Sequence, residues 1–307
     1  MYTVGLMLSL MPRKSHFFVT VFHEPFTNAS NCSVTRDLLL LDDSFRTEQL
    51  DLWFHNRTGQ ASYYPYFIQY TKYPIQGVLS CVPRSLGIAA ASDLYDQSQL
   101  TSVIQNAKIN LQHYSKLFSN GNEQLQKGNE MQYKLLLDLW EQDRAAPLEI
   151  NLEPGYSGPT PPTERPKAKF TTINAVLYGP LSRGRTHITS TDPLEAPALD
   201  PAYYAHPLDF ETHVKGIELS RRILRTPPLD TIYEGEYEPG NSGKDVEVWA
   251  REVAASDNHV VGSLAMMPKE LGGVVDTRMK VYGVENVRVV GAFRLFFSFL
   301  GYSHDFL

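Results

Sequence analysis

The stretch from Ser256 to Val290 reads SDNHVVGSLAMMPKELGGVVDTRMKVYGVENVRVV and sets the interpretation of the whole chain. One histidine, His259, stands just ahead of a small-residue turn at Gly262 and Ser263, and the glycine pair Gly272-Gly273 follows. Glycine lets backbone approach a ligand closely, so this arrangement is typical of an imidazole exposed in a cavity. A lone histidine is more often structural, and both glycine sites fit plain turns as well.

Composition narrows the class of protein. The chain has 307 residues, 42% of them hydrophobic, which is enough to bury a sizeable core in one or two domains. Its net charge of -6 comes with scattered Lys and Arg, so neither nucleic acid nor a membrane surface is an expected partner. No run approaches the roughly 20 apolar residues of a membrane helix.

The cysteines and the glycosylation sequons bear on whether the protein is secreted. Two cysteines, Cys32 and Cys81, show no metal-ligand spacing, so we expect no metal site, and one disulfide stays an open alternative. The start of the chain does not fit a signal peptide, because its basic residues follow the apolar run. Secretion nevertheless stays open, because Asn-x-Ser/Thr sequons occur at Asn28, Asn31 and Asn56.

Periodicity predicts an α+β fold: a mostly antiparallel sheet flanked by helices on one face. The expected strands begin at Phe17, Leu148, Phe170 and Thr186, and the last two are predicted to pair as a hairpin across Ser182-Arg183-Gly184.

Four helices are expected between Leu94 and Val253. They run over Leu94–Ser119, Glu123–Glu141, Leu208–Leu224 and from a capping box of Ser242 and Asp245 through Val253. Gly121 is the predicted C-cap of the first of them. A shorter helix over Asp43–Phe54 and a tyrosine-rich wall over Tyr63–Tyr73 precede them.

The opening stretch resembles the C-terminal signature of the glucose-methanol-choline (GMC) family of FAD-dependent oxidoreductases. That signature is a His, two residues, Gly-Thr, Met-Pro, Gly-Gly-Val-Val-Asp, a Val-x-Gly turn and Asn-Leu-Arg-Val. The chain matches it, with Ser in place of Thr, at His259, Gly262-Ser263, Met267-Pro268, Gly272–Asp276, Val281–Gly283 and Asn286–Val289. Trp53–Gly59, Pro180–Ile188 and Asp192–Tyr203 also look like the substrate domain of fungal members.

The resemblance implies a chemistry. In the family, the hydride of an alcohol C–H bond goes to flavin N5 while a histidine takes the hydroxyl proton. That catalytic base would be His259, the cofactor would be FAD with Gly262 and Ser263 beside it, and the substrate would be a small alcohol or sugar-like molecule. Asn258 is expected to be a contact at best, Met266 and Met267 to pack beneath the site, and Asp276 to close its turn.

Two departures from the family pattern limit this interpretation. The Gly-x-Gly-x-x-Gly turn that seats an FAD pyrophosphate does not occur, so we expect the nucleotide-binding (Rossmann) half to be absent. After Val290 the chain reads Gly291-Ala292-Phe293 in place of Asp, a small residue and Ser, and His304 does not match the second catalytic position.

We therefore expect a truncated chain in three parts. These are a divergent start (1–15), a substrate-binding domain (16–255) and a C-terminal segment (256–307) that would complete the FAD domain, with a divergent tail (291–307). Without that domain, apolar surface is expected to be exposed at Val274, Val275 and Val287–Phe299. The alternative is a non-catalytic remnant that binds no flavin. A hydrolase using His259 is disfavoured, because no Gly-x-Ser-x-Gly elbow occurs.

Overall fold

The structure is a computed structural model. It describes residues 17–22, 44, 85–154, 156, 158–166, 168, 170–227, 229–231, 233–256 and 261–291. The predictions for Asp43–Phe54 (apart from Ser44), Tyr63–Tyr73, the sequons, both cysteines, His259 and the tail beyond Gly291 lie outside these residues.

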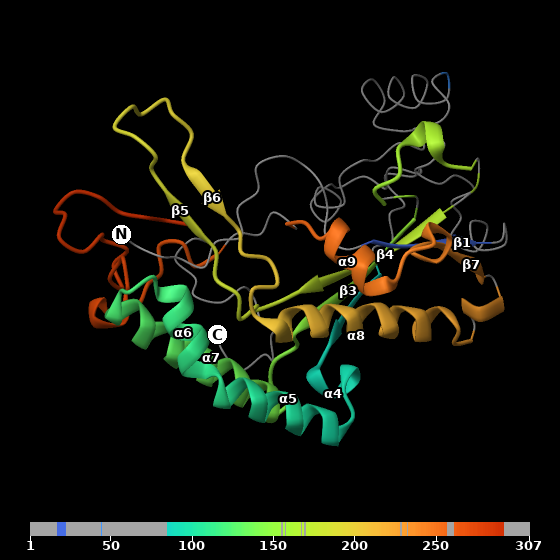
Figure 1. Cartoon of the computed structure of the whole chain (residues 1–307), viewed down its shortest axis with the longest axis horizontal. Coiled ribbons are helices and arrows are strands. Elements are labelled where there is room, and N and C mark those ends of the chain that lie inside the picture. Colours follow the sequence, from blue (N-terminus) through green and yellow to red (C-terminus); the bar gives the residue numbers. More distant parts are fainter. Residues whose placement is uncertain are drawn as a thin grey trace, which may run out of the picture.

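A five-stranded sheet forms the centre of the fold, in the order β2-β3-β4-β1-β7, with every neighbouring pair antiparallel. Figure 1 shows it lying above one long helix. The strands are β1 (Phe17–Phe22), β2 (Ser85–Ala89), β3 (Leu148–Pro154), β4 (Phe170–Leu177) and β7 (Tyr233–Glu238). The predicted α+β class and the three predicted strands at Phe17, Leu148 and Phe170 are confirmed.

The central strand β4 is buried along its whole length. Successive side chains point to opposite faces of a strand, so a strand buried throughout is covered on both faces. The face with Ile173 and Ala175 lies under α8 (Pro207–Leu224), because a Cβ added to Gly216 of that helix would meet Leu148 at 2.5 Å and Ala175 at 3.1 Å. Glycine at 216 thus permits close helix-to-sheet packing.

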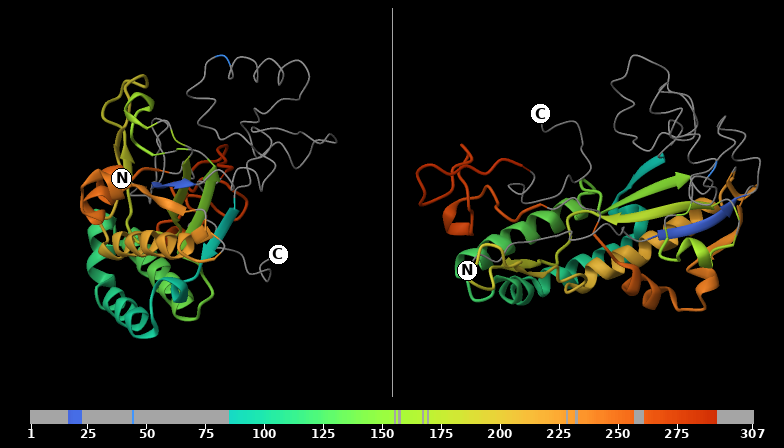
Figure 2. Two further views of the ribbon diagram at one scale, coloured as in Figure 1. Left: turned by 90° about the vertical axis from the view of Figure 1, so that its right-hand side faces the viewer. Right: turned by 90° about the horizontal axis from the view of Figure 1, so that it is seen from above.

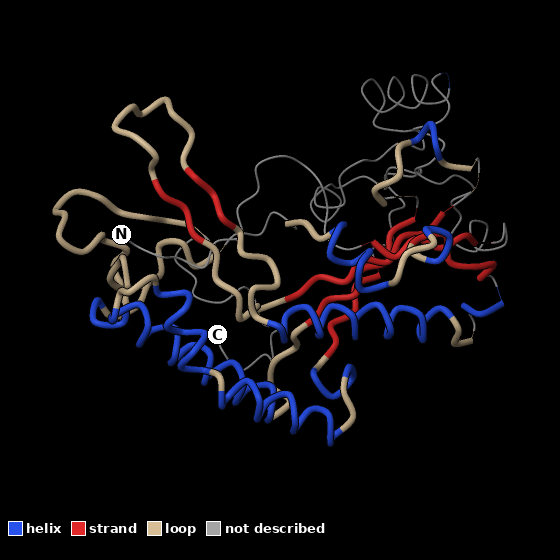
Figure 3. Tube along the Cα trace, in the orientation of Figure 1, coloured by secondary structure: helices blue, strands red, loops and turns tan. Residues whose placement is uncertain are grey.

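The helices between β2 and β3 form a second layer, visible in Figure 3 and in the left view of Figure 2 as a group below α8. The predicted Leu94–Ser119 helix is divided into two helices, α5 (Gln97–Ile109) and α6 (Leu111–Ser119), and the short α4 (Ala91–Leu94) ends at its first residue. The break at Asn110, with φ −90° and ψ 4°, changes the helical phase, and in α6 Phe118 is buried while Leu117 is exposed. Helix α7 (Glu123–Glu141) has the predicted bounds.

Helix ends differ from prediction in two places. The left-handed C-cap of α6 is Asn120 instead of Gly121, which follows it with φ +79°. Helix α9 (Val246–Val253) begins after Asp245, whose carboxylate accepts the backbone N–H groups of Glu247 and Val248. Ser242 lies in the short 3-10 helix η4 (Gly240–Ser242) and does not cap α9. The described residues also contain the 3-10 turns η2 (Pro162–Glu164), η3 (Leu229–Thr231) and η5 (Lys269–Leu271).

The hairpin predicted between Phe170–Leu177 and Thr186 is wrong. Thr186 belongs to β5 (Arg185–His187), which pairs with β6 (Ala198–Asp200) in a separate two-stranded arm that projects from the body in Figure 1. Both sides of β4 are already taken by β3 and β1, so its edge offers no place for β5. The sheet is completed by β2 and β7, which the sequence did not indicate.

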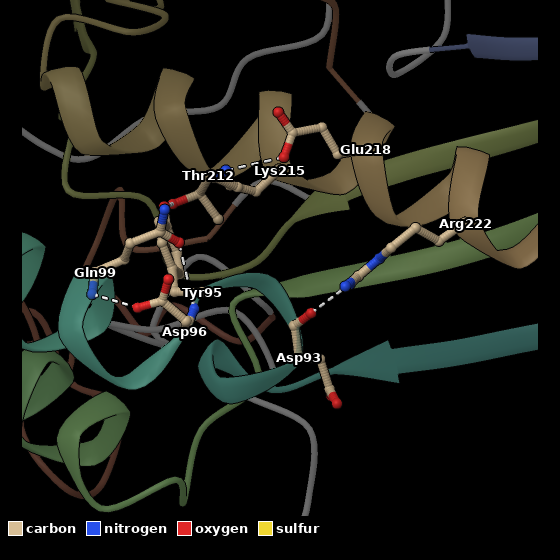
Figure 4. A network of polar contacts seen from close by, with 8 residues as sticks. All are labelled: Asp93, Tyr95, Asp96, Gln99, Thr212, Lys215, Glu218 and Arg222. Carbon is tan, nitrogen blue, oxygen red and sulfur yellow. Dashed lines mark hydrogen bonds and ion pairs between the residues drawn. The ribbon is translucent and has the colours of Figure 1, made fainter.

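A polar network ties the helical layer to α8 (Figure 4). The Tyr95 hydroxyl lies 3.1 Å from the Thr212 hydroxyl in the core, and the Arg222 guanidinium donates to the carbonyl of Asp93 at 2.7 Å. Burial raises the pKa of Tyr95 well above its usual value, so this hydroxyl stays protonated. Among the described helices, none combines the length and apolar character that crossing a membrane requires.

Helix α8 begins with a buried histidine cap. The Nδ1 atom of His206 accepts the N–H of Leu208 at 3.2 Å, which requires that nitrogen to be unprotonated. Burial, with the neighbouring Arg183 guanidinium, lowers the pKa of His206 from 6.5 to about 4.

We predict that acid weakens the fold through His206. Between pH 6.5 and about 4 the unfolded imidazole gains a proton and the folded one does not, so stability present above pH 6.5 is lost as the pH falls. The loss should reach about 2–3 kcal/mol at roughly 1.4 kcal/mol per pKa unit. Asparagine also caps a helix but does not titrate in this range. The free energy of unfolding, measured by urea denaturation at pH 7 and at pH 4.5, should therefore fall less in His206→Asn than in the unmodified chain, by that amount. An unchanged difference would contradict this assignment.

Candidate functional site

The segment Val261–Gly291 folds back on itself as a compact loop. The carbonyl of Ala265 accepts the N–H groups of Met267 at 3.1 Å and Val274 at 2.9 Å, and Met266 and Val275 form a parallel bridge. Val275 is fully buried, so the expectation that it is exposed is wrong, whereas Val287 and Val290 are exposed as expected. The family-like stretch is therefore an ordered unit where it is described.

The predicted glycine pair is required for two different reasons. Gly272 has φ +79°, a left-handed backbone that favours glycine, and it ends η5. A Cβ at Gly273 would lie 1.8 Å from the carbonyl oxygen of Met267, which is backbone and cannot move aside cheaply. This pair therefore shapes the loop.

The loop packs against helix α7 at a third glycine, Gly128. A Cβ added to Gly128 would lie 2.1 Å from the carbonyl oxygen of Leu271, so α7 and η5 touch backbone to backbone. Gly128 was not singled out from the sequence, although a glycine inside a strong helical pattern often marks such a close contact.

Gln132, one turn further along α7, connects two family-like motifs. Its Nε2 lies 3.2 Å from the sulfur of Met267, and its Oε1 accepts from Nη2 of Arg183 at 3.3 Å. Met267 is buried, in line with the expected packing role. The Ser182-Arg183-Gly184 turn and the C-terminal signature, more than 80 positions apart in the numbering, thus meet on one helix.

The loop that carries Arg183 is anchored to the first turn of α8. The Asp209 carboxylate of α8 accepts the N–H groups of Leu181 at 2.8 Å and Ser182 at 2.7 Å. The Arg183 guanidinium lies over the Tyr133 ring, 5.0 Å from its centroid, where a cation is attracted to the ring face. Its other bonds go to the carbonyls of Pro180 and Ser182.

Asp276 closes its turn as expected. Its carboxylate accepts the N–H groups of Arg278 at 2.8 Å and Lys280 at 2.9 Å, and these backbone hydrogen bonds, led by that of Lys280, lower its pKa. The Tyr282 hydroxyl donates to the carbonyl of Met267 at 3.2 Å and locks the far side of the loop.

The predicted site residues are placed unevenly. Gly262 has φ +81°, which favours glycine, and Ser263 is buried beside it. His259 and Asn258 lie within 257–260, outside the described residues. No group of three His, Cys, Asp or Glu side chains that could hold a metal occurs in the part of the chain that the structure describes.

Comparison with known proteins matches residues 180–292 to the family model described as GMC oxidoreductase. Residues 180–292 belong to the GMC oxidoreductase family. A GMC oxidoreductase family protein, Mala s 12, from Malassezia sympodialis is 41% identical over 123 residues, which is 39% of this chain and 20% of that protein. Glucose oxidase 1 from Penicillium expansum is 38% identical over 118 residues, 36% of this chain and 19% of that enzyme.

The fold is also shared with solved structures. An FAD-dependent oxidoreductase from Chaetomium thermophilum superposes with a TM-score of 0.67 at 20% identity, over 96% of this chain and 44% of that one. The chain therefore spans less than half of that solved relative, and the aligned part covers about a fifth of the two curated relatives.

We predict that Gly128→Ala releases the signature loop. Glycine to alanine inside a helix normally stabilises by about 1 kcal/mol, but here the added Cβ would collide with the Leu271 carbonyl. Hydrogen exchange of the Gly273, Val274 and Tyr282 amides should speed up at least about tenfold.

Gly87→Ala is the matched control, because the nearest atom to its new Cβ is 3.9 Å away. Equal exchange in both variants would show that the contact between α7 and η5 does not hold the loop.

Proposed function

We propose that this GMC chain is the substrate side of an FAD-dependent oxidoreductase that acts on the CH–OH group of a small alcohol or sugar-like donor. The observation that carries the proposal is the family match over residues 180–292, which contains His259 and the whole loop that follows it. Glucose oxidase among the relatives supports a CH–OH donor.

The proton step falls to this chain. Oxidation of an alcohol to a carbonyl removes a hydride from carbon and a proton from oxygen, and FAD, when bound, supplies the two-electron acceptor. In the proposal the imidazole of His259 accepts the hydroxyl proton, a task that suits an unperturbed pKa of about 6.5. Gly262 and Ser263, three and four residues on, are the proposed cofactor contacts.

The residues in hand do not fit a complete FAD site. A dinucleotide pyrophosphate is usually seated where a glycine-rich turn after a strand opens a helix. In the described part of the chain, Ala90 joins β2 to α4, a helix of 4 residues, and the first turn of α9 already binds the Asp245 carboxylate. We therefore assign no step of the reaction to the flavin within these residues.

This mismatch favours one alternative, a chain that folds around its sheet and binds no flavin. The two candidates differ in an observable, because a flavoprotein carries visible absorption through gel filtration. Colourless protein would favour the alternative for this chain.

The proposal, unlike the alternative, requires that the purified chain co-elutes with flavin and that an alcohol donor bleaches it in the absence of oxygen. His259→Ala should slow the bleaching by about 10²–10⁴-fold, the usual contribution of a general base, with the flavin content unchanged. Added imidazole should restore part of the rate.

His113→Ala is the matched control, since His113 is exposed on α6. Equal rates in the His259 and His113 variants would rule out His259 as the base.

A further inference from the structure

The turn between α6 and α7 joins an asparagine directly to a glycine. Asn120 is the C-cap of α6 in a left-handed conformation, with φ 49° and ψ 41°, and Gly121 follows it with φ +79°. Both residues are exposed. The dipeptide Asn-Gly occurs once in the 307 residues of the chain. This turn therefore presents that dipeptide to solvent at the end of a helix.

The side-chain amide of an asparagine can react with the backbone nitrogen of the next residue. Here the Gly121 nitrogen would form a bond to Cγ of Asn120, the side-chain nitrogen would leave with the displaced proton as ammonia, and a five-membered succinimide would remain. Water then opens this ring. Breaking the ring bond at Cγ gives aspartate, and breaking the one at the main-chain carbonyl carbon gives isoaspartate, whose backbone is longer by one CH₂. Either way a carboxylate replaces a neutral amide.

The surroundings of Gly121 leave room for this reaction. Within the described part of the chain, its N–H donates no backbone hydrogen bond, and no atom beyond its chain neighbours lies within 4 Å of the place a Cβ would take. Asn122, in the same turn, differs in both respects. It is followed by Glu123, and its Oδ1 already accepts the N–H of Leu125 at 3.0 Å as the N-cap of α7. The chemistry therefore selects Asn120.

The product would place a charge at the unfavourable end of a helix. The unpaired carbonyls at the C-terminus of α6 carry partial negative charge, so they repel a carboxylate at position 120. At position 122 the same charge would stand at the N-terminus of α7, where it is favourable. The turn also lies close to the loop over Val261–Gly291, because a Cβ on Gly272 would be 3.0 Å from Cα of Leu125.

We infer that Asn120 is a site of deamidation and that the carboxylate formed there weakens the C-terminal end of α6. This modification needs neither His259 nor flavin, so it stands apart from the proposed function.

Mass spectrometry of the full chain, held under mildly alkaline conditions and digested at intervals, tests the site. The tryptic peptide Leu117–Lys127 contains both Asn120 and Asn122, so each reports under identical conditions. The mass gain of an amide-to-acid conversion should accumulate at Asn120, with aspartate and isoaspartate forms that separate on chromatography, while Asn122 stays unchanged. No gain at Asn120, or an equal gain at Asn122, would overturn the inference.

Hydrogen exchange tests the effect on the helix. In Asn120→Asp the amides of Phe118 and Ser119 should exchange about two- to fivefold faster than in the unmodified chain, the usual effect of a charge at a helix end. Asn122→Asp is the matched control, because it adds the same charge two positions later, where aspartate caps α7 as asparagine does. It should speed up these amides less, and equal exchange in the two variants would contradict the weakening of α6.

Discussion

The hydrogen bonds from the N–H groups of Leu181 and Ser182 to the Asp209 carboxylate hold the parts of this fold together. They fix the loop that leaves β4 to the first turn of α8, and that loop carries Arg183 to Gln132. Burial raises the pKa of Asp209, while the N–H donors and Arg183 act against that shift. A carboxyl group this deep needs its donors, so moving the loop would leave it buried without them.

Close backbone contacts extend this constraint to the family signature. Gly128 and Gly273 each stand where a single added carbon would overlap a carbonyl oxygen, so the loop at Met267 fits α7 in one position. The Gln132 side chain then hydrogen-bonds to both segments, to Arg183 through its oxygen and to the Met267 sulfur through its nitrogen. The described segment from Val261 onward therefore has its position set by α7 and by the loop that carries Arg183.

Sequence reasoning succeeded where a segment's own pattern decided the outcome. Helix α7 and strand β4 have the predicted bounds because their periodicity is strong and uninterrupted. It failed where a partner decided. Thr186 is in a strand but pairs with β6. The YEGEYE sequence of β7 is a strand because it pairs with β1, and its side chains gain partners there, since Arg221 pairs with Glu236 and Glu238 accepts the Tyr156 hydroxyl. Neither partner is visible from local propensity, and the Asn110 break has no glycine or proline to announce it.

The signature loop and the sheet divide in the same way. Gly262, Gly272, Met267 and Asp276 were found from a linear motif, because each meets a local backbone or packing demand. Asn151 and Asn174, buried on the face of the sheet opposite α8, belong to no motif and become neighbours only through the register of β3 and β4. Both strands also pack on α8, so the core that orders the signature loop orders this polar face as well. The polar face and the signature loop therefore share one packed core, although only the loop could be found from the linear sequence.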